Sequence, residues 1–154
     1  MSHDDLEIAF GVIRSCPDAD FEGPKAESLI AKAEDSLGCR FPPTYRRFLL
    51  EFGCGDCYGL EIYGVINDAF ADAGIPDAVW ATLRERRDSG LPTGCIVIGS
   101  TESGSLWVID TSQTRPNDEA PVVEWVPGGS NDLTNQVSAD DFGHWLLREL
   151  QSHR

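Results

Sequence analysis

The sequence predicts an α+β protein in which an antiparallel sheet of about four to six strands is flanked by N-terminal helices and a closing C-terminal helix. Three observations carry this prediction. Apolar residues recur at helical spacing in the first half of the chain, run together as in strands between residues 95 and 126, and return to helical spacing at the end. Short connections between the strand-like runs favour antiparallel neighbours over βαβ units.

Each expected helix has an apolar stripe and recognisable ends. Proline is favoured in the first turn of a helix, and glycine directly after the last turn. Ser138, followed by Asp141, resembles a capping box at the start of the last helix. The expected helices are Asp4–Ser15, Pro24–Leu37, Pro43–Phe52, Pro76–Ser89 and a closing helix with Phe142, Trp145, Leu146 and Leu150 facing inward.

Four apolar runs are typical of strands, namely Leu60–Val65, Cys95–Ile98, Leu106–Ile109 and Pro121–Val126. The segment Thr101–Ser105 between two of them indicates a hairpin loop, and the acidic stretch 67–74 indicates irregular structure. Trp107 and Trp145 fall on apolar stripes. We therefore expect both indoles to pack between the sheet and the last helix.

The charge balance is strongly acidic, with 26 Asp and Glu against 12 Lys and Arg and a formal net charge of -14. Such a surface is repelled by nucleic acid and by anionic membranes, since both require basic side chains. It attracts a basic protein from a distance. The alternative is that the charge only maintains solubility. The one basic cluster, Arg84-Glu85-Arg86-Arg87, falls at a helix end, where cations complement the helix dipole.

Composition and cysteine usage predict a single cytoplasmic domain over residues 1–154. No apolar run reaches the length of about 18 residues that a membrane span needs. The first residues are acidic and lack the basic region of a signal peptide. Five cysteines at irregular positions argue against a disulfide framework and for a reducing compartment. We expect a monomer or a weak dimer.

Chemical motifs are weak throughout the chain. Cys54-Gly55-Asp56-Cys57 is a CxxC, but the other three cysteines form no second pair of the kind a zinc site needs. The pair also follows a helix instead of opening one, so a redox geometry is absent, and we expect a tight loop with two half-buried cysteines. No nucleophile stands in a recognisable pattern with its base. We therefore predict no catalytic residues, no metal and no cofactor.

The segment from Ile30 to Leu49 carries a specific pattern, Ile30-x-x-Ala33-Glu34-x-x-Leu37-Gly38-x-x-Phe41-Pro42-x-x-Tyr45-x-x-Phe48-Leu49. It resembles the N-terminal signature of the SUKH superfamily, whose members include bacterial immunity proteins and a fungal cell-wall synthesis regulator. The paired strands that end at Asp110 and the closing Asp141-Phe142-x-x-Trp145-Leu146 are similar as well. The resemblance covers about Lys25 to Leu150, and residues 1–24 are expected to form a helical extension.

This resemblance implies a non-enzymatic binding protein. The first hypothesis is an immunity protein that neutralises a polymorphic bacterial toxin, such as a nuclease, by direct occlusion. The second is a regulatory adaptor of the same fold that binds a cellular protein, and the third is a small hydrolase with a carboxylate site. The candidate partner-binding residues are Asp56, Tyr58, Glu61, Tyr63, Asp68, Asp72, Glu102, Asp118 and Glu119.

Overall fold

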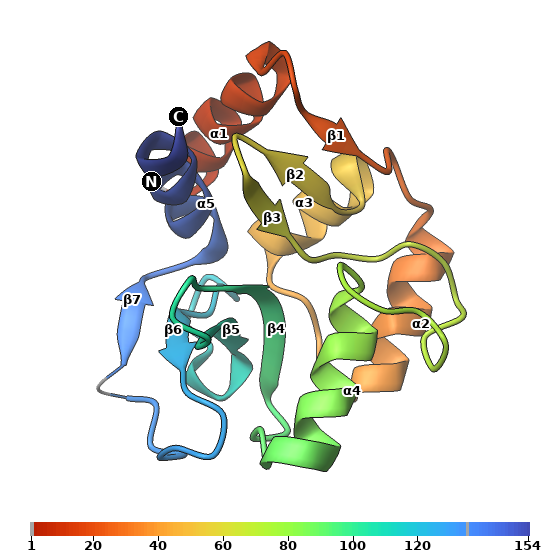
Figure 1. The fold of residues 1–154 in the computed structure, drawn as a ribbon, viewed down its shortest axis with the longest axis vertical. Coiled ribbons are helices and arrows are strands. Elements are labelled where there is room, and N and C mark those ends of the chain that lie inside the picture. The colour runs from red at the N-terminus through yellow and green to blue at the C-terminus, as the bar shows by residue number, and fades with distance from the viewer. Residues whose placement is uncertain (1, 135) are drawn as a thin grey trace.

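A computed structural model describes residues 2–134 and 136–154, and it confirms the predicted α+β class (Figure 1). The helices are α1 (Ser2–Ser15), α2 (Glu27–Leu37), α3 (Pro43–Phe52), α4 (Ala78–Ser89) and α5 (Phe142–His153), with a short 3-10 helix at Thr111–Gln113. The strands are β1 (Asp20–Phe21), β2 (Gly55–Cys57), β3 (Leu60–Ile62), β4 (Cys95–Ser100), β5 (Leu106–Asp110), β6 (Val122–Trp125) and β7 (Val137–Ala139).

The strands divide between two antiparallel sheets. One has three strands in the order β1-β2-β3, and the other has four in the order β4-β5-β6-β7. The backbone joins the two sheets directly after β3, where the Tyr63 N–H donates to the Ile98 carbonyl at 2.9 Å. Seven strands in two sheets thus stand where the sequence indicated a single sheet.

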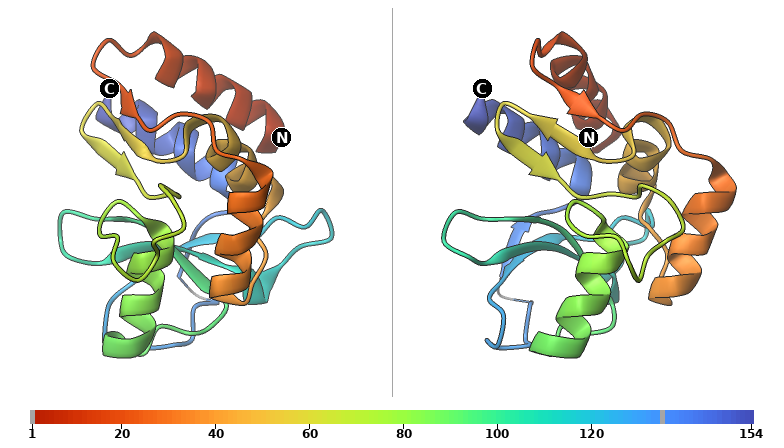
Figure 2. Two further views of the ribbon diagram at one scale, coloured as in Figure 1. Left: turned by 90° about the vertical axis from the view of Figure 1, so that its right-hand side faces the viewer. Right: turned by 45° about the vertical axis from the view of Figure 1, so that its right-hand side comes forward.

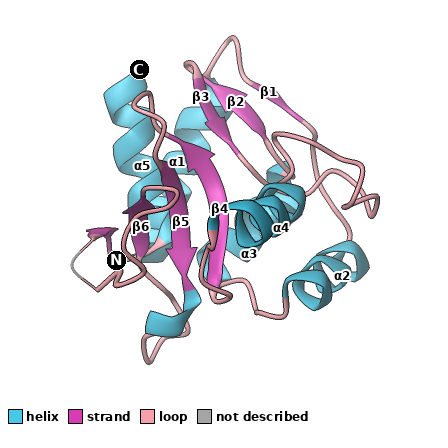
Figure 3. Ribbon diagram, turned by 60° about the horizontal axis from the view of Figure 1, so that its bottom comes forward, coloured by secondary structure: helices cyan, strands magenta, loops and turns pink. Residues whose placement is uncertain are grey.

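Helices cover both faces of the four-stranded sheet. Alternate side chains of β4 point to opposite faces: Ile96 and Ile98 belong to the larger core, which α1, α2, α3 and α5 complete. Cys95 and Val97 point to a second, smaller core beneath α4. Figure 2 shows α1 beside α5 at one end of the molecule, and Figure 3 shows α4 beside β4.

The expected packing of the two tryptophans is confirmed. Trp145 of α5 is fully buried, and its ring meets the Trp107 ring of β5 edge-on, with 6.0 Å between the centroids. Trp107 itself is half-buried. The last helix therefore docks on the sheet through a pair of indoles, one inside the core and one at its border.

Several helix ends agree with the sequence and others do not. Gly38 and Gly90 end α2 and α4 in the left-handed conformation, with φ of 70° and 73°, as a residue without Cβ can do at no steric cost. However, α2 begins after Ala26 instead of near Pro24. Likewise α4 begins after Asp77, because the Asp77 carboxylate accepts the Trp80 N–H at 2.8 Å and caps the helix.

The expected capping box of the last helix is wrong. Ser138 lies in β7, and Asp141 is the residue that caps α5, with its carboxylate accepting the His144 N–H at 2.9 Å. The cap therefore sits three residues later than expected. The strands β1 and β7 were not predicted. The strand expected over residues 60–65 ends at Ile62.

The CxxC segment differs from the expected tight loop. Cys57 is the last residue of β2, which pairs with β3. Cys54 and Cys57 are 1% and 0% exposed, so both are core residues and neither is half-buried. Cys54 directly precedes β2 and Cys57 ends it, and both side chains lie on the core side of the hairpin.

Candidate functional site

A groove of about 640 Å³ opens beside the hairpin of β2 and β3. Its walls come from β3, from the connection between β4 and β5, and from the end of α5. Figure 2 shows the β2–β3 turn, the β4–β5 connection and the C-terminus on the same side of the molecule in both views. The lining residues are Gly59, Leu60, Glu61, Ser100, Thr101, Glu102, Ser103, Trp107, Glu124, Glu149 and His153. We call this hollow the acidic groove.

Four carboxylates face the acidic groove, and strand geometry explains two of them. Glu61 is the exposed middle residue of β3, between buried Leu60 and Ile62. Glu124 is likewise the exposed residue of β6. Side chains alternate along a strand, so burying the neighbours forces each carboxylate outward. Glu102 sits in the exposed β4–β5 connection, and Glu149 is on α5.

The four carboxylates differ in their partners. Ser105 Oγ donates to the Glu124 carboxylate at 2.6 Å, and Arg148 Nε lies 3.3 Å from Glu149. Glu61 and Glu102 make no ion pair with any residue that the structure describes. The groove therefore holds two acids that no cation of the described residues compensates.

Glu61 also lies opposite another acid. The register of the hairpin pairs it directly with Asp56. Partial burial, and then the Asp56 charge, raise the pKa of the Glu61 carboxyl above its ordinary value. Like charges placed opposite one another destabilise a strand pair. The β2–β3 hairpin thus retains a repulsion that a nearby cation would relieve.

Trp107 forms the aromatic wall of the groove. Because Trp107 lines the groove, part of this residue is exposed there, and Trp145 packs against it from the core side. The Arg148 guanidinium lies 5.9 Å from the centre of the Trp107 ring. That position suits a cation–π contact. The indole is held in place by both neighbours.

Of the predicted residues, four belong to the groove or to its hairpin. Glu61 and Glu102 line the groove, and Asp56 is opposite Glu61. Tyr58 lies in the β2–β3 turn with a positive φ of 55°, and desolvation raises the pKa of its hydroxyl. The groove thus brings Glu61 of the hairpin and Glu102 of the β4–β5 connection together, although they are far apart in the sequence.

Asp68 and Asp72 lie elsewhere, in the loop that precedes α4. Asp68 is exposed and its carboxylate is 3.5 Å from Lys32 Nζ of α2. Asp72 is also exposed and lines a smaller hollow of about 280 Å³ within this loop. Neither residue lines the acidic groove.

Asp118 lines a third hollow, of about 640 Å³, between the α2–α3 corner and the loop after the 3-10 helix. Arg40 and Arg46 are part of the same wall, so the charges there are mixed. The exposed side chain of Asp118 remains a candidate for contact with a partner. The hollow beside Asp118 and the acidic groove share no lining residue, so the two hollows are separate.

Two of the predicted residues point into the protein. Glu119 is 2% exposed, and its carboxylate accepts both the Thr44 N–H at 3.0 Å and the Thr44 hydroxyl at 2.7 Å. Tyr63 is also 2% exposed and packs in the core beneath α4. The expectation that these two side chains face a partner is wrong, because both are buried. Both look like surface residues in the sequence because acid and phenol groups are usually exposed.

The sequence prediction overlooked three groove residues. Trp107 was expected only in the core, and Glu124 and Glu149 were not singled out. The signal for Glu124 was available, since it stands between Val123 and Trp125 in an alternating strand. No comparable signal exists for Glu149, because its position depends on how α5 docks against the sheet.

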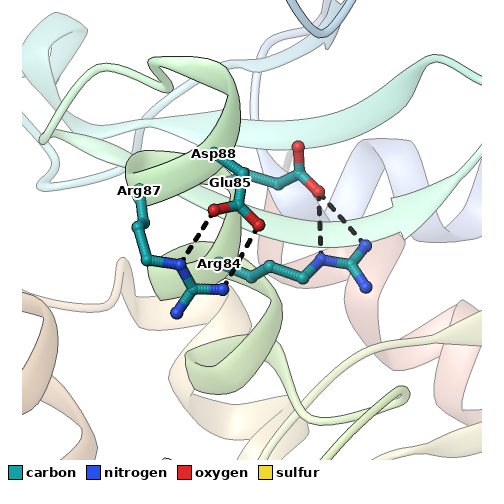
Figure 4. A network of polar contacts seen from close by, with 4 residues as sticks. All are labelled: Arg84, Glu85, Arg87 and Asp88. Carbon is teal, nitrogen blue, oxygen red and sulfur yellow. Dashed lines mark hydrogen bonds and ion pairs between the residues drawn. The ribbon is translucent and has the colours of Figure 1, made fainter.

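The basic cluster on α4 is occupied by contacts within the chain (Figure 4). Arg84 pairs with Glu85 and Arg87 with Asp88, at 3.2 and 2.8 Å. Arg86 donates to the Leu37 and Thr93 carbonyls. These contacts join α4 to the end of α2 and account for the cluster without a ligand.

The cysteines show no sign of a reactive centre. Burial raises the pKa of the Cys54 and Cys57 thiols to about 12. Reactive cysteines need the opposite shift. Within residues 2–134 and 136–154, no three His, Cys, Asp or Glu side chains gather as a metal site. The prediction that the protein uses no metal or cofactor stays a prediction.

Comparison with known families shows the superfamily to which the chain belongs. The sequence model of the family SUKH_5, described as SMI1-KNR4 cell-wall, matches residues 15–151. The chain belongs to the SUKH superfamily. The match leaves nearly all of α1 outside the SUKH domain, although Leu6, Phe10 and Ile13 of this helix are buried in the core.

The structure also explains the SUKH signature residues. Glu34 accepts the Phe41 N–H at 2.8 Å and pairs with Arg46 at 2.8 Å, so it holds the corner between α2 and α3. The Tyr45 hydroxyl donates to the Tyr63 carbonyl at 2.8 Å. The signature is therefore a set of packing and backbone contacts.

In the described residues no helix is both long and apolar enough to cross a membrane.

Proposed function

We propose that this SUKH protein is an immunity protein that binds a basic bacterial toxin and neutralises it by occlusion. Membership of the superfamily supports a protein-binding role, in immunity or in regulation. The finer assignment is carried by one observation: Glu61 and Glu102 line a groove, and no cation of the described chain pairs with either.

Occlusion requires no chemistry from the immunity protein. Complementary potentials accelerate encounter, and desolvated charge pairs slow dissociation. A nuclease toxin carries a basic cleft for its substrate, and carboxylates can occupy that cleft in place of phosphates. The net charge of -14 gives the long-range attraction, and the groove gives a concave surface for the contact. The bound toxin would then be unable to admit substrate.

The regulatory adaptor is the second candidate, favoured by the description of the matching family as SMI1-KNR4 cell-wall. It would use the same surface for a cellular partner. The two functions differ in their partner, so a toxin encoded beside this gene separates them.

The test is protection of cells that express the neighbouring toxin. Wild-type protein should restore growth, and Glu61→Lys with Glu102→Lys should abolish the protection. Asp68→Lys with Asp72→Lys is the matched control, because it makes the same change in charge at the other loop, and it should still protect. Failure of the wild type to protect against any toxin of the neighbourhood would contradict immunity and leave the regulatory role.

A further inference from the structure

The acidic groove combines a concave shape, an aromatic wall and free negative charge, and these features together select a kind of partner side chain. The wall is Trp107, half-buried and supported from behind by Trp145. Tryptophan is among the residues most enriched at energetically dominant interface positions. A concave surface with an aromatic wall suits a protruding side chain of a partner better than a flat charged surface does.

Two carboxylates of the groove, Glu61 and Glu102, would be neutralised by a cation from a partner. Arg148 already compensates Glu149, and Ser105 satisfies Glu124. Glu61 has only Asp56 opposite it, which raises the pKa of Glu61 after the effect of burial. A cation placed beside Glu61 and Glu102 would remove a repulsion present in the free protein.

The aromatic wall distinguishes arginine from lysine. A guanidinium group is planar, stacks on aromatic rings and can bond a carboxylate through two N–H groups, whereas an ammonium group is a compact, strongly hydrated point charge. The chain supplies its own example, since the Arg148 guanidinium lies over the Trp107 ring at 5.9 Å. Trp107 also lines the groove, and a second guanidinium in the groove would contact it there.

From this arrangement we infer that the acidic groove binds an arginine side chain of the partner, with Trp107 as the stacking surface and Glu61 and Glu102 as counter-charges. The inference rests on the proposed function, because it names the group that a basic partner inserts. Asp56 lies opposite Glu61 on the same hairpin, and Tyr58 lies in its turn, but neither lines the groove.

The probe is a hexa-arginine peptide, with hexa-lysine and a neutral peptide of equal length as comparisons. Binding is followed by two-dimensional NMR of the tryptophan indole N–H groups. We expect the Trp107 resonance to shift on titration with hexa-arginine. The Trp80 resonance should stay unchanged, because Trp80 does not line the groove. Hexa-lysine should bind about three- to tenfold more weakly, the range expected for one lost stacking contact.

Matched charge variants decide between a specific groove and general attraction. Glu61→Gln with Glu102→Gln should weaken hexa-arginine binding about tenfold. Asp68→Asn with Asp72→Asn removes the same number of charges and should leave the affinity within about twofold. All four positions are exposed, so both proteins should fold.

Three results would overturn the inference: no binding of hexa-arginine, equal weakening in both double variants, or shifts that spare Trp107. These failures are separable from failure of the proposed function. If the cognate toxin binds wild type and the Glu61→Gln, Glu102→Gln variant equally well, the immunity role stands and the toxin uses another surface.

Discussion

The α2–α3 corner and the acidic groove are both lined by glutamates, but the two regions use them in opposite ways. At the corner, Glu34 accepts the Phe41 N–H and Glu119 accepts the Thr44 N–H. In the groove, Glu61 and Glu102 meet neither a backbone donor nor a cation among the described residues. The corner carboxylates stabilise the fold through backbone donors, whereas Glu61 and Glu102 remain available to the proposed partner.

The corner shows why its glutamates are needed. Helix α3 begins after Pro42, which supplies no side-chain acceptor for the first N–H groups of the helix. Glu119, which is distant in sequence, provides that acceptor from the loop before β6. This contact makes the corner depend on a long-range hydrogen bond to a carboxylate, whereas Glu61 and Glu102 of the groove make no such bond among the described residues.

The largest expected effect on stability comes from Trp145, which packs behind the Trp107 wall of the groove. Trp145→Ala should lower the free energy of unfolding by about 3–5 kcal/mol, as for other buried aromatic residues, because it opens a cavity between α5 and the sheet. Thermal denaturation of the variant measures this. An unchanged melting temperature would show that α5 does not dock through Trp145, and the wall around Trp107 would need a different support.

A smaller loss is expected at the corner. Glu34→Ala removes the acceptor of the Phe41 N–H and one partner of Arg46, which should cost about 1–3 kcal/mol. Chemical denaturation checks the value. The exposed Asp35→Ala is a suitable control, since a surface substitution of this kind stays within about 0.5 kcal/mol. Equal effects in the two variants would remove the structural role given to Glu34.

The third prediction concerns pH. Burial raises the pKa of Glu119 above its ordinary value of 4.5, while the Thr44 hydrogen bonds oppose the shift. A carboxyl with a raised folded-state pKa contributes most stability below its unfolded-state pKa, and this contribution is lost as pH rises through the folded-state pKa. In the Glu119→Gln variant the side chain at position 119 does not titrate, so the variant lacks this pH-dependent contribution to stability.

The stability of Glu119→Gln relative to wild type should therefore increase as the pH rises from about 4 to 7. Unfolding free energies of both proteins at several pH values measure the difference. Asp141→Asn is a poor control because that residue caps α5. The exposed Glu102→Gln is the better one. A pH-independent difference for Glu119→Gln would contradict the raised pKa.

The smallest effect belongs to the groove. Glu61→Gln should raise the free energy of unfolding at neutral pH by about 0.2–1 kcal/mol, since it removes the like charge opposite Asp56. The gain should disappear below the ordinary glutamate pKa of 4.5, where Glu61 of the wild type is protonated as well. High salt should reduce it. Destabilisation by Glu61→Gln would mean that this carboxylate has a structural partner.

Local signals in the sequence predicted much of the fold. The helix ends at Gly38, Gly53 and Gly90 follow from the conformational freedom of glycine, and the two long strands β4 and β5 follow from their apolar runs. The short strands β1 and β2 have two and three residues, so they offer no periodicity to detect. Their pairing depends on contacts between the chain before α2 and the chain after α3.

The site was predictable only in part, for the same reason. Glu61 stands between two apolar residues of a predicted strand, which indicates an exposed side chain, but nothing local separates Glu102 from the buried Glu119. Only the fold shows that Glu119 faces Thr44 and that Glu61 faces a groove. Net charge alone therefore favours a basic partner without indicating which residues would bind it.

The division between fold-supporting and partner-binding carboxylates is tested most directly by the affinity for the cognate toxin, measured by titration calorimetry on folded variants. Glu61→Gln with Glu102→Gln should bind about tenfold or more weakly than wild type, with unchanged unfolding free energy within about 0.5–1 kcal/mol. Glu34→Ala should be less stable yet bind like wild type at a temperature where it is folded. Unchanged affinity in the groove variant, with loss of affinity in Glu34→Ala, would contradict the account.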